Sequence, residues 1–403
     1  MTRGCLVCGS DDLTRLLDLG PQPISNRFLR TRDEEEERFP VALQQCGACG
    51  LVQIEAPVPA RALVPPYDWI TYNEPEPHLD DLVDTIVRLP GIGAGSVAAG
   101  VSFKDDSTLA RLERKGVRTW RLDLAGDLGV DDGRSGHGVE TIQDRLTPDA
   151  ARAIAWRRGR ADVLLVRHIF EHAERPHAFM EALRHLTAPG GYIVVEVPDC
   201  SRAMDACDYT TIWEEHTLYF TPQTFHHAFA AGGFDLVRAE NYPYPFENSL
   251  VAIAKPGGDG SGARPPRAAV DEERRRGAAF GRSFADYRDK VRSFVDEHRR
   301  TRGPIALFGA GHLACTWVCA FGVADAIDCV IDDNPHKRGL FMPGSRLPIV
   351  GSPALLDRGI TLCLLSLNPT GQEKVIANNR AFADRGGIFA SIFPASARGL
   401  ALR

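Results

Sequence analysis

The sequence lacks the features that mark several classes of protein. No apolar run approaches the ~20 residues that a helix needs to cross a bilayer, so we expect no membrane span. The first residues also lack the apolar core of a signal peptide. With 53 acidic and 47 basic side chains the net charge is −6, which provides no basic surface for nucleic acid. We therefore expect a cytoplasmic protein that binds neither nucleic acid nor membrane.

The ten cysteines do not have the pattern of a disulfide framework. Six of them are scattered through apolar or loop segments, at positions 200, 207, 315, 319, 329 and 363. The other four form two Cys-x-x-Cys pairs, each followed by a glycine: Cys5 with Cys8, and Cys46 with Cys49. Two such pairs supply four thiolates in the tetrahedral arrangement that Zn²⁺ prefers, with no position left open. The sequence thus predicts a structural zinc site in a reducing compartment.

The chain has 403 residues, too many for a single ordinary core, and its patterns predict three parts. Residues 1–65 form the expected zinc-binding module. Across 66–256, apolar strands alternate with amphipathic helices, which predicts parallel βαβ units. A glycine-rich break follows, and the third part, 268–403, opens with a long charged helix over about 268–300, after which the alternation resumes. The expected fold class is α/β, with two Rossmann-like doubly wound domains preceded by the zinc-binding module.

The segment 162–172, with the turn Pro189-Gly190-Gly191 after it, strongly resembles class I S-adenosylmethionine (SAM) methyltransferases. In that family the strand brings the chain to the carboxyl edge of the sheet, where the cofactor binds. His168-x-x-Glu171-His172 also matches an inverted zinc-protease pattern. That pattern belongs in the middle of a helix, whereas this one directly follows a buried strand, so the methyltransferase interpretation is favoured.

The expected cofactor loop is poor in glycine. The family usually carries an acidic residue and several glycines after the first strand, but the segment 97–107 keeps only Gly100. The helix that begins near Ser107 still offers N–H donors, and Asp123 ends the second strand, where an acid holds ribose hydroxyls. The resemblance implies SAM as the cofactor. The residues expected to bind it are Gly100, Ser102, Lys104, Asp123, Asp144, Arg167 and His168.

The sharpest resemblance lies in 199–220, together with the zinc module and the C-terminal domain. This combination is similar to the sugar C-methyltransferases that act on nucleotide-linked 4-keto-6-deoxyhexoses. The chain keeps the Glu215-His216 pair of that family but has Trp213 where tyrosine is usual and Glu214 where histidine is common. The resemblance implies that His216 is the base or its partner and that Glu215 orients or polarises. Trp213 and Tyr72 complete the expected catalytic set.

The chemistry explains why such residues are wanted. A carbon beside a ketone must lose a proton before it attacks a sulfonium methyl group, and a base with a pKa near the working pH suits this step. The enolate oxygen then needs hydrogen-bond donors aimed at it. Either His216 or a tuned Glu215 fits the role of base.

The resemblance also implies residues that hold the sugar nucleotide. The segment 305–334 follows the order strand, glycine turn, helix, strand, acid, as in nucleotide-binding domains. Lys337 and Arg338 follow, where they are placed to meet a diphosphate. The residues expected to bind substrate are Tyr67, Asn73, His172, Asn248, Gly309, Gly311, Asp332, Lys337 and Arg338.

We therefore expect a SAM-dependent C-methyltransferase acting on a nucleotide-activated keto-deoxysugar in secondary metabolism such as antibiotic biosynthesis. Its partner is the nucleotide-linked sugar, and it is expected to be a monomer or a small homo-oligomer. Two alternatives remain open. The same scaffold suits a SAM-independent sugar epimerase or isomerase, or a non-catalytic partner that binds a nucleotide sugar.

Overall fold

The computed structural model describes residues 4–67, 69, 74–130, 138–258, 260 and 264–402. By its internal contacts the chain divides into two compact units. The first contains residues 1–15, 44–201 and 215–275, and the second contains 16–43, 202–214 and 276–403. The chain passes from one unit to the other within β1 (Leu13–Pro23) and again within β2 (Arg38–Cys46). The three-part domain boundaries expected from the sequence remain a prediction.

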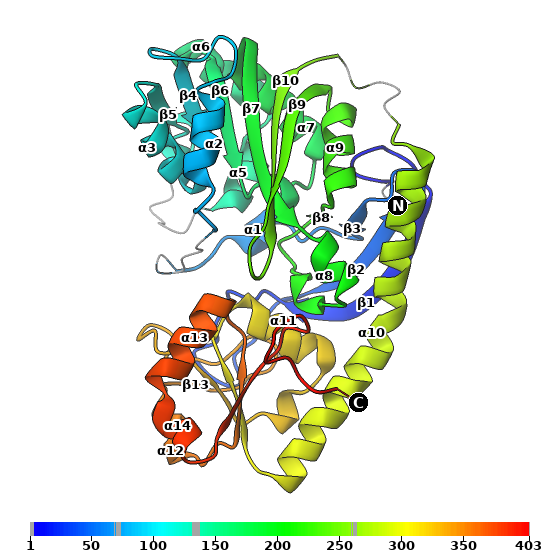
Figure 1. The fold of residues 1–403 in the computed structure, drawn as a ribbon, viewed down its shortest axis with the longest axis vertical. Coiled ribbons are helices and arrows are strands. Elements are labelled where there is room, and N and C mark those ends of the chain that lie inside the picture. Colours follow the sequence, from blue (N-terminus) through cyan, green and yellow to red (C-terminus); the bar gives the residue numbers. More distant parts are fainter. Residues whose placement is uncertain are drawn as a thin grey trace. The chain divides into compact units, whose positions relative to one another are not determined.

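The first unit is built on a six-stranded sheet in the order β5-β4-β6-β7-β10-β9 (Figure 1). The first four strands are parallel, and β10 runs antiparallel to both β7 and β9. Their bounds are β4 Val97–Gly100, β5 Arg118–Arg121, β6 Ala161–Arg167, β7 Thr187–Asp199, β9 Phe234–Tyr242 and β10 Asn248–Pro256. This arrangement confirms the methyltransferase-like α/β fold.

Helices cover both faces of this sheet because successive strand residues point to opposite sides. Apolar residues of α2 (Leu79–Ile86) and α3 (Asp106–Arg114) pack on one face. The other face packs against α5 (Val139–Arg145), α6 (Pro148–Arg158), α7 (Pro176–Leu186) and α9 (Pro222–Ala231). The remaining helical segments of this unit are α1 Ala60–Leu63, η1 Phe103–Asp105, α4 Leu124–Leu128 and η2 Phe170–His172.

Two short strands join the cysteine-rich segment to the core of the first unit. β3 (Val52–Ile54) follows the second cysteine pair and pairs antiparallel with β8 (Leu218–Tyr219). Cys46, Cys49 and Leu51 belong to the same apolar cluster as Leu218 and Phe220. The segment that carries the four cysteines therefore packs directly on the methyltransferase-like core.

The second unit contains a parallel five-stranded sheet in the order β13-β12-β11-β14-β15, which confirms the second Rossmann-like domain. The strands are β11 Ile305–Phe308, β12 Cys329–Ile331, β13 Ile349–Val350, β14 Leu362–Leu365 and β15 Ile388–Ser391. The helices are α8 Ser201–Asp205, η3 Tyr209–Thr211, α11 His312–Phe321, η4 Ala324–Ala326, α12 Ala354–Asp357, α13 Pro369–Asn378 and α14 Arg380–Asp384.

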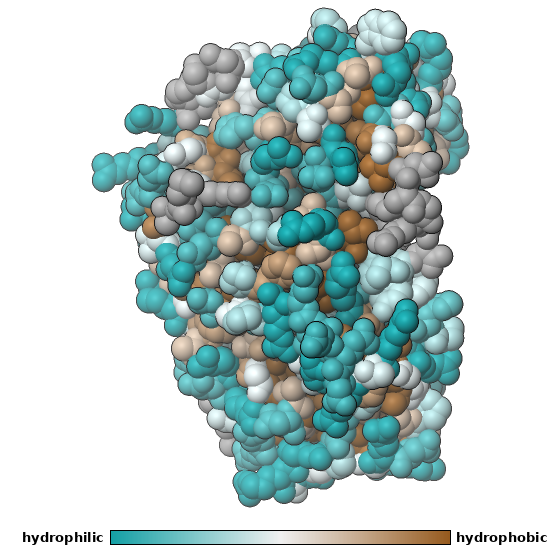
Figure 2. Space-filling model, turned by 180° about the vertical axis from the view of Figure 1, so that it is seen from behind, coloured by the Kyte–Doolittle hydropathy of each residue, from teal (hydrophilic) through white to brown (hydrophobic). Residues whose placement is uncertain are grey.

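The longest helix, α10 (Arg267–Thr301), matches the charged helix expected from the sequence. Its apolar side chains Phe280 and Phe284 pack against Tyr209 in the second unit, with ring centroids 4.5 and 4.9 Å from that ring. Polar side chains cover most of the face drawn in Figure 2. Among the described residues, no helix is long and apolar enough to cross a membrane.

Candidate zinc centre and active site

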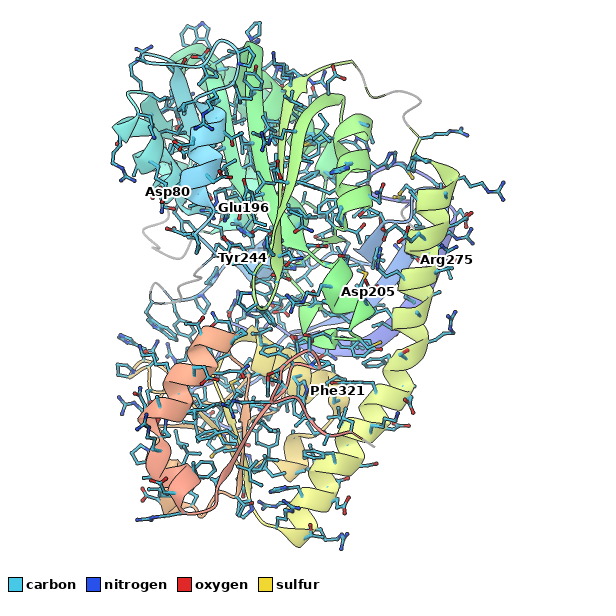
Figure 3. All side chains as sticks on the ribbon, viewed as in Figure 1. Asp80, Glu196, Asp205, Tyr244, Arg275 and Phe321 are labelled. Carbon is cyan, nitrogen blue, oxygen red and sulfur yellow. The ribbon has the colours of Figure 1, made fainter. Side chains whose placement is uncertain are left out.

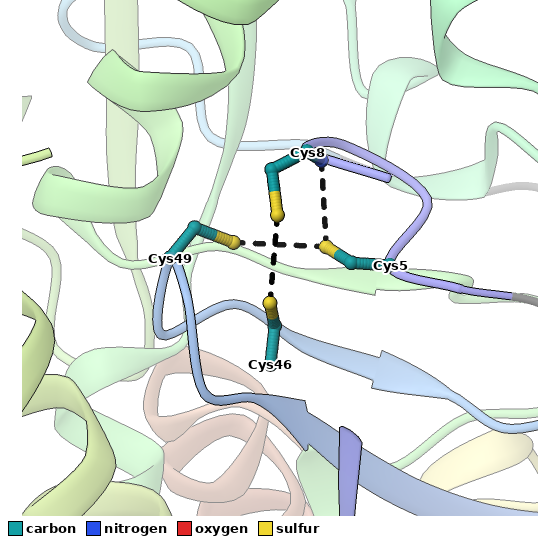
Figure 4. Close-up of side chains that lie close together, drawn as sticks. All are labelled: Cys5, Cys8, Cys46 and Cys49. Atoms are coloured by element: carbon teal, nitrogen blue, oxygen red, sulfur yellow. Dashed lines mark hydrogen bonds between the residues drawn. The ribbon is translucent and has the colours of Figure 1, made fainter. Parts of the chain in front are cut away.

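The four predicted zinc ligands come together in the first unit. The sulfurs of Cys5 and Cys49 lie 3.6 Å apart, and those of Cys8 and Cys46 lie 3.5 Å apart (Figure 4). Sulfurs bound to one Zn²⁺ at ~2.3 Å in a tetrahedron are separated by roughly 3.8 Å. The four thiols therefore fit a closed zinc site, as expected from their spacing.

Glycines shape the two turns that present these sulfurs. Gly9 and Gly50 have φ angles of +72° and +81°, in the left-handed region that suits glycine best. The backbone N–H of Gly9 donates to the Cys5 carbonyl, and that of Gly50 donates to the Cys46 carbonyl, both at 2.9 Å. Each turn thus folds back beneath its cysteine pair.

The zinc-binding segment also holds the backbone next to His216. The Ile54 N–H donates to the Thr217 carbonyl at 3.0 Å, and the Thr217 N–H donates to the Glu171 carbonyl at 2.8 Å. Strand β8 then continues the pairing with β3. His216 is therefore anchored on its C-terminal side by hydrogen bonds to both the zinc module and η2.

His216 lies in a cluster of carboxylates and imidazoles within the first unit. One carboxylate oxygen of Glu171 and one ring nitrogen each of His172 and His216 lie within 4.8 Å of one another. The same holds for one carboxylate oxygen each of Glu140 and Glu215 and one ring nitrogen of His172. The rings of His172 and His216 meet edge to face, with centroids 4.9 Å apart. Although Glu215 and His216 are adjacent in sequence, their side chains belong to two triads that share His172.

Burial controls the charges of this cluster. Burial lowers the pKa of His172 well below its usual value, and the nearby charge of His216 lowers it further, so His172 is neutral. Burial also raises the pKa of Glu140, although a hydrogen bond with Glu215 acts in the opposite direction. His216 remains half-buried, while Glu215 is only 3% exposed. The site thus offers a partly accessible imidazole beside a neutral one.

A second cluster of charges surrounds the fully buried Glu196 on β7. Its carboxylate accepts hydrogen bonds from Arg167 Nε at 2.5 Å and Ser249 Oγ at 2.7 Å. The Nε2 atoms of His78 and His168 lie 3.3 and 3.1 Å from it. His78 also joins this cluster to Tyr244, whose hydroxyl lies 2.6 Å from its Nδ1. Figure 3 labels Glu196 and Tyr244 at this edge of the sheet.

His168 connects the two clusters. Its Nδ1 lies 3.6 Å from Glu171 and 3.7 Å from Glu74, on the side opposite Glu196. Burial opposes its positive charge, but Glu74 and Glu196 raise the pKa of His168 to about 10. Its φ of +50° is unusual for a residue other than glycine and indicates a conformation imposed by these contacts. His168 is thus a charged imidazolium held by three carboxylates.

The loop after β4 is organised by Asp105 rather than by several glycines. The Asp105 carboxylate accepts the N–H groups of Val101 and Ser102 at 2.8 Å and that of Arg167 at 2.9 Å. A Cβ added to Gly100 would lie 2.8 Å from the Asp105 Cβ. Internal packing therefore accounts for glycine at position 100, which the sequence alone had assigned to cofactor approach.

The other expected cofactor residues differ in their environments. Lys104 forms a 2.6 Å ion pair with Glu74, and its backbone carbonyl accepts from Arg167. Asp123 is exposed after β5 and caps α4 through a 2.6 Å bond from Gly126. Asp144 is exposed on α5.

These residues fit SAM in part. The exposed carboxylate of Asp123 stands at the carboxyl end of β5, where ribose hydroxyls are bound in open α/β sheets. Phe103, 46% exposed, stands at the start of η1 beside that edge and offers an apolar surface.

Two expected site residues, Tyr72 and Asn73, lie outside the described residues. Of the others in the first unit, Tyr67 stacks on Trp69 with centroids 4.6 Å apart. Asn248 begins β10 and lies 3.4 Å from the carboxylate of Asp199. The roles of these four residues remain predictions.

The remaining expected residues lie in the second unit. Trp213 stacks on His312, the first residue of α11, at 4.3 Å between centroids. Gly309 and Gly311 form the turn between β11 and α11.

Two charged residues of that unit are joined by an ion pair. The Lys337 ammonium donates to the Ala310 carbonyl at 2.6 Å and lies 3.1 Å from Asp332, so it supports the β11–α11 turn. Arg338 is exposed. Of the two basic residues Lys337 and Arg338, Arg338 is therefore the one that is open to an anionic ligand.

Sequence reasoning missed Glu140, Glu74, Asp105 and Glu196. Glu196 carried a signal, because it is a lone acid within the apolar run 192–197. Glu140 carried none, since nothing in its local sequence shows that α5 brings it to Glu215.

Three family models match the chain in succession. A zinc binding domain matches residues 5–63, a methyltransferase domain matches 100–239, and a C-methyltransferase C-terminal domain matches 267–394. The C-methyltransferase NovU of Streptomyces niveus is 28% identical, over 96% of this chain and 94% of that protein.

Solved structures resemble parts of the chain. One is the 1,6-didemethyltoxoflavin-N1-methyltransferase of Burkholderia thailandensis with S-adenosylhomocysteine, 15% identical over 45% of this chain and 79% of that chain, with a TM-score of 0.30. Another is the magnesium protoporphyrin IX methyltransferase of Synechocystis PCC 6803, 13% identical over 44% and 80%, with a TM-score of 0.30.

The three matched domains stand in the order that the sequence predicted, and together they account for most of the chain. From its zinc binding domain to its C-methyltransferase C-terminal domain, the chain carries the three matched domains in succession and is similar over nearly its whole length to the C-methyltransferase NovU.

Proposed function

We propose that this protein is a cytoplasmic, SAM-dependent C-methyltransferase that methylates a carbon beside the ketone of a nucleotide-activated deoxysugar in antibiotic biosynthesis. The observation that carries the proposal is the cluster in which the half-buried His216 faces the neutral His172 and the buried Glu171. SAM supplies an electrophilic methyl group when bound. The protein is proposed to act as a monomer or a small homo-oligomer.

The residues of the cluster divide the work of the reaction. His216 takes the proton from the carbon beside the ketone, and the electrons of that C–H bond form the enolate. That carbon then bonds to the methyl group, and the electrons of the methyl–sulfur bond stay on sulfur. The buried charges around His168 hold η2, which carries Glu171 and His172, in place during this step.

The acceptor is the part of the proposal that needs direct identification. Nucleotide-linked 4-keto-6-deoxysugars would be incubated with SAM carrying a carbon-13 methyl group. We expect a product whose labelled methyl carbon couples to a ring carbon in the NMR spectrum. A label bound to oxygen or nitrogen would contradict C-methylation. Deuterium uptake from solvent without SAM, and no transfer with it, would favour the isomerase.

A further inference from the structure

The carboxyl groups of Glu140 and Glu215 form a buried pair beside His172. Both residues are at most 5% exposed, and their oxygens lie within 4.8 Å of each other and of the His172 ring. At this separation the charge of each carboxyl group affects the protonation of the other. Ionising both carboxyl groups at this separation in a buried site has a high free-energy cost, because neither charge is well solvated.

The surroundings of Glu140 leave one of its oxygens without a partner. Among the described residues, Glu140 Oε2 is buried and has no hydrogen bond. It lies over Gly138, where an added Cβ would be only 2.8 Å away. The other charges facing this region are Glu171, the ammonium of Lys104 and the imidazolium of His168, while His172 is neutral.

We propose that Glu140 is a positioning residue that holds a proton between its carboxyl group and that of Glu215, so that the pair carries a single negative charge. With one proton shared, one carboxyl group donates to the other, and the direction of the remaining charge is fixed. The His172 ring, which meets the His216 ring edge to face at 4.9 Å between centroids, then faces one negative charge from this pair instead of two. A second charge would stabilise the imidazolium form of His216 and leave less of it in the neutral form that accepts a proton.

The effect on turnover rests on the proposed function, and two variants separate the protonated form from the ionised one. Glu140→Gln keeps a neutral donor of the same shape, so we expect kcat within about threefold of wild type and a pH profile without the ionisation of the pair. Glu140→Leu removes the donor, so we expect kcat to fall at least tenfold, roughly the effect of losing one hydrogen bond to a charged group, with KM for SAM unchanged. The exposed Glu181→Gln is the control.

Infrared spectroscopy tests the proton without any turnover. The wild-type protein should show the carbonyl band of a buried protonated carboxyl group at neutral pH. Asp105 and Glu214 are also buried carboxyl groups with a pKa raised to about 7, so Glu140→Gln should lose only part of the band relative to the wild type, and Glu181→Gln should lose none of it. A wild-type spectrum without the band would overturn the proposal even if methyl transfer is confirmed.

Kinetics gives the second way to overturn it. If Glu140→Gln loses as much activity as Glu140→Leu, the ionised carboxylate is required, either as a base or as a ligand of a cation. The proposal of a shared proton is then wrong. Failure to find any methyl acceptor would count against the proposed function but would leave the infrared result decisive for the pair.

Discussion

His168 is charged in the folded protein because Glu74, Glu171 and Glu196 surround its ring. Its folded pKa of about 10 lies above the ordinary value of 6.5. The folded state therefore keeps a proton that the unfolded state releases, and this contribution to stability is complete below pH ~6.5 and is lost as the pH rises through ~10.

This shift predicts how stability responds to pH. Between pH 6.5 and 10 the free energy of unfolding of the wild type should fall, and His168→Gln should be less stable at pH 6.5 with a flatter dependence. Urea unfolding at a series of pH values measures this. His177→Gln, which changes an exposed histidine, is the control and should follow the wild type. Equal slopes in wild type and His168→Gln would show that His168 does not carry the charge.

Gly100 offers a second test at the level of a residue. An alanine Cβ there would meet Asp105 at 2.8 Å and Leu109 at 2.9 Å. We expect Gly100→Ala to lower the free energy of unfolding by about 1–3 kcal/mol, as overpacking of a core does. Gly93→Ala is the control, because no atom lies within 4 Å of its added Cβ. If Gly100→Ala leaves the free energy of unfolding unchanged but weakens SAM binding, Gly100 belongs to the cofactor site instead.

At the level of elements, β3 and β8 link the zinc site to the proposed active site at His216. We expect Cys49→Ser to lose zinc and to speed amide exchange in Leu218 and Tyr219, because β8 would lose its partner strand. Exchange measured by mass spectrometry should change little in β11 and β14. Cys207→Ser, outside the zinc site, is the control. If exchange in β8 is unaffected while zinc is lost, the zinc site does not support His216.

The regular secondary structure could be predicted from local sequence patterns. The alternation of apolar strands and helices predicted both sheets, and α10 begins and ends within one residue of the expected 268–300. Strands β1 and β2 show the limit of this reasoning, because each continues from one unit into the other. Local sequence cannot indicate such a path, since it depends on contacts with residues far along the chain.

For the molecule as a whole, the spacing of residues along the sequence was informative where the residues of one site are close in sequence. It was uninformative where they are far apart. The Cys-x-x-Cys pairs predicted the zinc site, and the Glu215-His216 pair predicted one part of the proposed active site. Glu140 is brought to the same place by α5, about 75 positions earlier in the chain, and only the fold reveals it. The role of each catalytic residue therefore has to be tested in the folded protein.

Single-turnover methyl transfer by His216→Asn tests the central claim most directly. The account predicts that this variant folds, keeps its zinc and binds SAM as the wild type does, while transfer to the keto-sugar slows by ~100-fold or more, the usual contribution of a general base. Transfer within a few fold of the wild-type rate would contradict the assignment of proton removal to His216.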